Sequence, residues 1–273
     1  MRSRRPDGAM KAYLLAIAAF LVLPQLIVIV VAFSSAEFVS FPPPGYSLRW
    51  FAKVVGDSSF MRPMLNSLVL GLLAAAVSAI LAIPAAIAVV RHRFIGAEAM
   101  QAFLLSPLSM PTLILSIALL FFLSDVGLGN TFAGLLIGHV VITLPYMVRT
   151  IVAVYSSTDA RIEEAAYTLG APPLATLWHI TLPMLRPALF AGGLFAFLIS
   201  FDDVAISLML SNARSMTLPV SILNYLVNNP DPAVAAISVV QMVIVVAALL
   251  LLDRVHGLQN LTLPSSREGG KNV

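Results

Sequence analysis

The sequence predicts an all-α integral membrane protein with six transmembrane helices. Hydrophobic residues make up 59% of the 273 residues and charged residues only 11%, against about 25% charged residues in a soluble domain. Six apolar runs each reach the roughly 20 residues that a helix needs to cross a bilayer. The runs are 12–36, 63–90, 99–124, 126–148, 187–213, which contains two aspartates, and 232–252.

The first run follows a basic tail, 1–11, and could be read as a secretory signal peptide because Ser34 and Ala36 are small residues at cleavage-like spacing. Its apolar part is longer than the roughly 7 to 15 residues of a signal-peptide core. We therefore interpret it as a retained first transmembrane helix.

A polar loop is expected over 37–62, between the first and second runs. It contains the stretch FPPPGYSLRWF at 41–51. Three consecutive prolines exclude a helix there, and the aromatic side chains Tyr46, Trp50 and Phe51 suit a membrane interface.

Helix breakers lie inside the middle runs. The boundary between the third and fourth runs depends on the short turn-forming stretch SDVGLGN at 124–130. Prolines within these helices produce simple kinks or line a pathway where neighbouring groups satisfy the freed backbone. They are Pro84, Pro107, Pro111 and Pro145.

The distribution of basic residues predicts the orientation. If the N-terminus is cytoplasmic, the inner segments hold twelve of the 16 lysines and arginines and the outer segments four. The positive-inside rule then places both termini in the cytoplasm. We expect a cytoplasmic tail at 1–11, one transmembrane domain at 12–254, a second cytoplasmic tail at 255–273, and a cytoplasmic loop between the fourth and fifth spans.

That loop contains a predicted helix over 160–169, capped by Thr158 or Asp159. Four apolar positions share one face of it, namely Ile162, Ala165, Ala166 and Leu169. Gly170 ends the helix, and the two prolines that follow delay the next one. An amphipathic helix with acidic residues in its early turns is typical of a docking element, although an ordinary connecting loop is the alternative.

Seven residues of this loop stand at a recognisable spacing over twenty positions: Glu164, Ala165, Ala166, Gly170, Ile180, Leu182 and Pro183. The pattern resembles the EAA loop in the permease subunits of ATP-binding cassette importers. The resemblance implies a type I importer permease bundle in which 156–187 is the coupling loop. Glu163 joins the same seven as an expected ATPase-coupling residue, with Glu164 as the docking carboxylate and Gly170 as the turn.

The resemblance also implies partners. They are a homologous second permease subunit, two cytoplasmic ATP-binding subunits and a periplasmic or extracellular solute-binding protein, assembled in a bacterial inner membrane. No nucleic-acid partner is expected, because the net charge of +3 is modest and reflects membrane orientation.

Asp202 and Asp203 are the charged residues inside a predicted span. An aspartate in the bilayer costs about 2.5 to 3.5 kcal/mol on insertion scales, so the pair must face protein or water. Asp203 would share a helical stripe with Ser200, Ser207 and Ser211. We predict a substrate pathway at Asp202, Asp203, Ser200 and Ser207, with a structural hydrogen-bonding role as the alternative.

The stretches SFDDVAIS at 200–207, FPPPGYSLRWF at 41–51 and NSL at 66–68 resemble the spermidine/putrescine branch of the same family. Its substrates are polycationic amines, which acidic residues in a pathway would suit. The remaining buried polar residues are expected to be hydrogen-bond partners between helices. They are Gln25, Asn66, Ser116, His139, Thr143 and Gln241.

Several activities are not expected. No phosphate-binding G-x-x-x-x-G-K-[ST] motif occurs, since Asn272 follows the Gly270–Lys271 pair. We expect no enzyme activity, no cofactor and no metal site, because there is no cysteine and the four histidines are far apart. Other function classes are an ion-coupled secondary transporter using Asp202 and Asp203, and a membrane scaffold.

Overall fold

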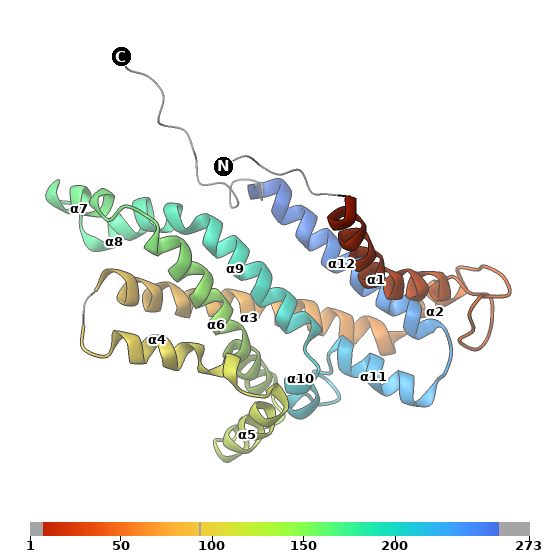
Figure 1. Cartoon of the computed structure of the whole chain (residues 1–273). Coiled ribbons are helices and arrows are strands. Elements are labelled where there is room, and N and C mark those ends of the chain that lie inside the picture. The colour runs from red at the N-terminus through yellow and green to blue at the C-terminus, as the bar shows by residue number, and fades with distance from the viewer. Residues whose placement is uncertain (1–7, 93, 257–273) are drawn as a thin grey trace. The chain divides into compact units, whose positions relative to one another are not determined.

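The computed structural model describes residues 8–92 and 94–256 (Figure 1). The predicted tails therefore lie outside the described residues over 1–7 and 257–273. Within the described part the chain is helical, and its β-type pairing is one isolated bridge between Ser34 and Tyr46. The predicted all-α class is confirmed.

The helices follow one another in a simple order. They are α1 (Gly8–Ala32), α2 (Arg49–Gly56), α3 (Ser58–Arg91), α4 (Ala97–Leu105), the 3-10 turn η1 (Ser106–Ser109), α5 (Thr112–Asp125), α6 (Phe132–Ser156), α7 (Arg161–Thr168), α8 (Pro173–Thr176), the π-helical η2 (Leu177–Thr181), α9 (Leu182–Asp202), α10 (Ala205–Leu210), α11 (Leu218–Asn228) and α12 (Ala233–His256).

In the described part, five continuous helical stretches are long and apolar enough to cross a membrane: Met10–Ala32, Ser58–Arg91, Phe132–Ser156, Pro173–Asp202 and Ala233–Leu251. A sixth span exists if the bent pair Ala97–Ser109 and Thr112–Asp125 counts as one. The expected third span over 99–124 is not one continuous helix, because this pair bends by 108°.

Two prolines account for that bend. Pro107 lies in η1 and Pro111 caps α5 with extended backbone angles, φ −57° and ψ 121°. Neither residue has an N–H group for the helical ladder, and Pro111 also disfavours helical geometry at Met110 before it. The predicted kink is therefore a complete break in the helix.

The chain divides into two compact parts. Among the described residues, the larger comprises 63–92, 94–220 and 245–256, and its core forms where α6 and α9 run side by side (Figure 1). Close approach depends on small residues there. A Cβ atom on Gly192 would lie 2.8 Å from the sulfur of Met147, and one on Gly138 would lie 2.6 Å from a methyl group of Leu210.

The smaller part comprises, among the described residues, 8–62 and 221–244. The predicted loop at 37–62 forms the short helix α2 after its prolines, and Trp50 and Val54 bury one face of that helix. The rings of Phe60 and Tyr225 pack at a tilt of 56° with centroids 4.8 Å apart, and the Ser221 hydroxyl donates a hydrogen bond to the carbonyl of Ser59. The segment that follows the prolines is therefore more ordered than the sequence indicated.

Candidate functional site

Helix α7 ends in a tight turn at Gly170. A side-chain oxygen of Asp159 accepts a hydrogen bond from the N–H of Arg161 at the start of the helix. At its end, Ala171 donates to Ala166 and Gly170 donates to Tyr167, both at 3.0 Å, which is the Schellman pattern. Gly170 has a φ of +82°, where a side chain would be strained. The predicted helix and turn are confirmed, with the helix over Arg161–Thr168, but its N-cap residue is Ala160 and not Thr158 or Asp159.

A long helical rod begins directly after this turn. Pro173–Asp202 forms 30 continuous helical residues, or about 45 Å at 1.5 Å per residue. Ile180 lies in its π-helical turn, and Leu182 and Pro183 open α9. A π turn fits this position because Pro183 has no N–H to donate to the helical ladder.

Helix α7 buries a different face from the one that its sequence pattern suggests. Glu163 and Ala166 are its buried residues. The apolar side chains of Ile162, Tyr167 and Leu169 are 50%, 50% and 88% exposed. A water-soluble helix usually buries its apolar stripe, so the exposed apolar face of α7 is unusual.

Glu163 is the centre of a buried polar cluster. Its Oε2 accepts a hydrogen bond from Nε of Arg91 at 2.8 Å, and its Oε1 accepts hydrogen bonds from the hydroxyls of Tyr155, at 2.8 Å, and Thr181. Arg91 also donates to Oγ1 of Thr158 at 2.9 Å and lies 4.2 Å from the ring centre of Tyr155. The cluster joins the ends of α3 and α6 to α7 and η2.

The environment keeps the Glu163 carboxylate ionised. Burial alone would raise its pKa, but hydrogen bonds from Thr181, Arg91 and Tyr155 outweigh that effect, and its pKa falls below the ordinary value of 4.5. Three donors on one carboxylate, including a positive charge, favour the charged form. Sequence reasoning grouped Glu163 with the coupling residues but missed Arg91, Tyr155 and Thr181.

Glu164 points to a different environment from its neighbour. It is exposed, as is Ala165. It lines an open groove of about 550 Å³ together with His92, Tyr167 and Leu177. Glu163 lines the same groove. Adjacent residues on a helix point about 100° apart, and here Glu163 is buried while Glu164 is exposed.

The helix carrying Asp202 ends at that residue. Asp203 has extended angles, φ −70° and ψ 128°, and α10 begins two residues later. The prediction that Ser200, Asp203, Ser207 and Ser211 share one face of a single helix is therefore wrong, because the helix is interrupted between Asp202 and Ala205. Asp203 instead accepts a hydrogen bond from the N–H of Ser207 at 3.0 Å.

The break separates the two aspartates. Asp202 is exposed, while Asp203 is partly buried and lines a cavity of about 140 Å³. The other lining residues are Pro107, Leu108, Met110, Thr112, Leu115, Ile142, Tyr146 and Ile199. A carboxylate, an aromatic ring and a thioether thus surround a space next to the bend at Pro107 and Pro111.

Ser200 and Ser207 do come together, through a residue that sequence reasoning did not select as a site. His139 of α6 bonds Ser200 Oγ at 2.7 Å and Ser207 Oγ at 3.1 Å with its two ring nitrogens. Its role as a hydrogen-bond partner between helices was predicted and is confirmed, as is that of Thr143, which bonds Ser78 at 2.8 Å.

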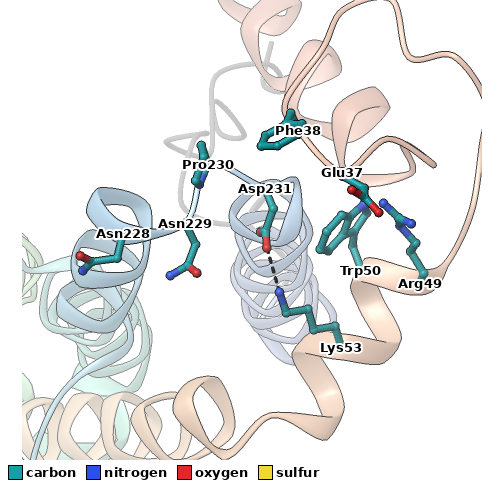
Figure 2. A pocket seen from close by; sticks show the side chains of 9 residues that line it. All are labelled: Glu37, Phe38, Arg49, Trp50, Lys53, Asn228, Asn229, Pro230 and Asp231. Atoms are coloured by element: carbon teal, nitrogen blue, oxygen red, sulfur yellow. Dashed lines mark hydrogen bonds and ion pairs between the residues drawn. The ribbon is translucent and has the colours of Figure 1, made fainter.

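A polar pocket of about 500 Å³ lies in the smaller part of the chain (Figure 2). Nζ of Lys53 lies 2.8 Å from Oδ2 of Asp231 and reaches it across the pocket. Lys53 and Arg49 both lie over the ring of Trp50, at 5.1 and 4.6 Å from its centre. These contacts tie helix α2 to the segment that precedes α12.

No cluster of three potential metal ligands occurs within the two described ranges. Of the histidines, His139 is used in the serine contacts and His179 bonds the carbonyl of Ala175 at 2.9 Å. The described residues form three cavities that carboxylates line, at Asp203, at Glu163 and Glu164, and at Glu37 and Asp231.

Together, several membrane-length helices and an exposed helix–turn connected to one of them define a multi-pass membrane protein of the transport class. The chain belongs to the family of binding-protein-dependent transport system inner membrane components, which it matches over residues 78–259. It is therefore a permease subunit, and this assignment supports the importer interpretation and not the ion-coupled carrier.

Similar proteins cover most of the chain. The spermidine/putrescine transport system permease protein PotC of Haemophilus influenzae is 29% identical over 88% of this chain and 93% of that protein. The putrescine transport system permease protein PotI of Escherichia coli K12 is 33% identical over 80% of each. The molybdenum transport system permease protein ModB of Mycobacterium bovis is 28% identical over 81% of this chain and 90% of ModB.

The fold matches that of a solved transporter. The crystal structure of a bacterial ABC transporter involved in the import of the acidic polysaccharide alginate is similar with a TM-score of 0.73. The match covers 94% of this chain and 98% of the other at 21% identity. At this identity the similarity supports the fold alone.

Proposed function

We propose that the segment 156–187 receives movement from separate ATP-binding subunits and transmits it to a cation pathway at Asp203. The observation that carries this proposal is the mechanical connection of α7. One end of the 30-residue rod is joined to α7 by the Gly170 turn, and the other end stops at Asp202, beside Asp203.

The buried cluster makes that connection stiff. Glu163 accepts hydrogen bonds from Thr181 on the rod and from Arg91 at the end of α3. Helix α7 therefore cannot shift alone, because moving it would separate a buried ion pair. A force applied to α7 passes to the rod through both the backbone turn and the Glu163 side chain.

The outer face of α7 is suited to docking. Its exposed apolar side chains Ile162 and Leu169 would be covered by a groove on a partner, and the exposed Glu164 would fix the register. A short amphipathic helix in a partner groove is a common recognition mode. We assign this face to the ATP-binding subunits.

In the proposed cycle, ATP binding closes the pair of ATP-binding subunits and pulls on α7. The rod then moves relative to the bend at Pro107 and Pro111, and the space around Asp203 changes its access. A homologous second permease completes the pathway, and a solute-binding protein delivers the substrate. This requires α7 to face the cytoplasm, with both termini on the same side, in agreement with the positive-inside rule.

We propose a polyamine or a related small cationic solute as the substrate. Asp203 supplies a negative charge, and the Tyr146 ring and Met110 sulfur in the same cavity suit the methylene and ammonium groups of an alkylamine. A volume of about 140 Å³ exceeds the roughly 30 Å³ of a water molecule several-fold. This is enough for one ammonium group and its neighbouring methylenes. PotC and PotI carry polyamine names.

The docking claim is tested in the assembled complex reconstituted with its ATP-binding subunits and binding protein. Glu164→Lys and Gly170→Arg should leave the chain inserted but abolish the stimulation of ATP hydrolysis by loaded binding protein. Glu164→Gln is the matched control, because it keeps the size and removes the charge without reversing it. Normal stimulation with Glu164→Lys and Gly170→Arg would contradict the assignment.

The substrate claim is tested by competition. Uptake of labelled putrescine should be inhibited by spermidine and not by an uncharged analogue of the same length. Asp203→Asn should lower uptake at least about tenfold, as expected when one desolvated charge pair of more than 1.4 kcal/mol is lost. Equal inhibition by the uncharged analogue would rule out a cation pathway at Asp203.

A further inference from the structure

His139 bridges the two sides of the α9–α10 break. Ser200 belongs to the last turn of α9 and Ser207 to the first turn of α10, and the imidazole bonds one hydroxyl with each ring nitrogen, at 2.7 and 3.1 Å. The His139 side chain is completely buried. A neutral imidazole has one donor and one acceptor nitrogen, and either tautomer is satisfied because a serine hydroxyl can donate or accept.

Asp203 depends on the same turn of α10. Its carboxylate accepts the N–H of Ser207, the residue whose hydroxyl bonds His139. Helix α10 in turn packs closely on α6, since a Cβ atom on Gly138 would lie 2.7 Å from Ile206. His139 and Asp203 are therefore linked through one residue, Ser207, whose hydroxyl bonds the imidazole and whose N–H bonds the carboxylate.

The backbone at the break gives no such support. Asp203 is extended and Val204 has φ −101° and ψ −41°, so the helical hydrogen-bond ladder does not continue from α9 into α10. Side chains therefore join the two helices here, through the apolar cluster that contains Ile206 and Leu210 and through hydrogen bonds. His139 hydrogen-bonds a serine of each helix.

We propose that His139 is a positioning residue for cation transport: it fixes α10 against α9 and so holds the Asp203 carboxylate in the wall of the cavity. The inference rests on the proposed role of Asp203. His139 does not line the cavity, and it acts through Ser207. Replacing His139 should therefore change the rate of transport only by displacing the Asp203 carboxylate.

Thr143 offers a matched control on the same helix. It lies one turn after His139, is equally buried, and bonds Ser78 of α3 at 2.8 Å. Its hydroxyl also donates to the backbone carbonyls of His139 and Val140, and its side-chain hydrogen bonds involve neither Ser200, Ser207 nor Asp203. Thr143→Val removes a buried hydrogen bond of the same kind without touching the break.

The experiment is a double-mutant cycle on diamine uptake by the reconstituted complex. His139→Leu should reduce uptake about tenfold when Asp203 is present, the effect of one broken buried hydrogen-bond pair. It should have no further effect in Asp203→Asn. Thr143→Val should lower uptake by the same factor in both backgrounds. Equal factors for His139→Leu in both backgrounds would show a merely structural role and overturn the inference.

A second measurement covers variants that fold poorly or transport too little. His139→Gln can keep the contact with Ser207 because its amide reaches the position of Nε2. The ratio of triamine to diamine uptake should change at least about threefold in His139→Leu, with a smaller change in His139→Gln. Loss of folded complex alone lowers both rates equally, so an unchanged ratio in both variants would overturn the inference. Normal uptake by Asp203→Asn would instead refute the proposed function of Asp203, and this inference with it.

Discussion

Two ion pairs of equal length differ in what surrounds them. Arg91–Glu163, at helix α7, and Lys53–Asp231, in the polar pocket, both have a nitrogen–oxygen distance of 2.8 Å. The side chains of the first pair are 18% and 7% exposed, and those of the second are 41% and 16% exposed. From the distance alone, the two ion pairs would be expected to contribute equally to stability.

The two ion pairs also differ in their hydrogen-bond partners. Both oxygens of Glu163 are used, by Arg91, Tyr155 and Thr181, on three different elements. Lys53 and Asp231 share the hydroxyl of Tyr225, at 2.8 Å from each. Buried charges without full compensation are expensive, whereas exposed pairs contribute about 0 to 1 kcal/mol. The chain therefore fixes the coupling loop much more firmly than the polar pocket.

The largest expected effect comes from breaking the buried pair. Glu163→Leu should destabilise the protein by about 3 to 5 kcal/mol, because it leaves Arg91 as an uncompensated buried charge. The double variant Glu163→Leu with Arg91→Met should recover most of that loss, since two apolar side chains can fill the same space. Thermal unfolding of the detergent-solubilised protein measures both. A double variant that is less stable than Glu163→Leu would show that the cluster is not organised around this pair.

A smaller effect is expected at the exposed pair. Lys53→Met should lower stability by at most about 1 kcal/mol, and 1 M salt should remove most of the difference from the unmodified protein. The same thermal unfolding assay applies. A loss above about 3 kcal/mol would mean that the polar pocket is as firmly held as the coupling loop, which would remove the contrast between the two regions.

The smallest effect is expected from pH within the physiological range. The pKa of Glu163 is lowered from 4.5, so its contribution is complete above pH 4.5 and is lost only as the pH falls through the lower folded value. Hydrogen bonds to Asp231 and Tyr225 raise the pKa of Lys53 above 10.5, so its contribution is complete below pH 10.5 and is lost above it.

Stability differences between the unmodified protein and Glu163→Gln should therefore stay constant from roughly pH 5.5 to 9.5 and shrink only in stronger acid. Unfolding curves at a series of pH values test this. A difference that disappears between pH 6 and 7 would mean that Glu163 titrates near neutrality and that its carboxylate is not held in the charged form.

Much of the fold follows from the sequence, because a run of about 20 apolar residues has few alternatives to a spanning helix. The turn at Gly170 was equally predictable, since glycine is the residue that adopts its positive φ without strain. The break at Pro107 and Pro111 was not, because a proline alone does not tell a kink from a complete bend.

The candidate site was only partly predictable. Apolar periodicity identified α7 but not which face is buried, and the structure buries Glu163 and leaves Leu169 outside. That outcome depends on Arg91, about 70 residues earlier in the chain. Likewise, helical offsets could not say which of Asp202 and Asp203 lines the cavity, because the helix ends between them.

The central claim is that α7 faces the cytoplasm and contacts the ATP-binding subunits. The chain has no cysteine, so a single introduced thiol reports one position. Leu169→Cys, at a side chain that is 88% exposed, should react with a membrane-impermeant maleimide in inside-out vesicles and not in intact spheroplasts. Bound ATP-binding subunits should protect it. Val39→Cys, in the loop before α2, should show the opposite sidedness. Labelling of Leu169→Cys from the outer side would contradict the account.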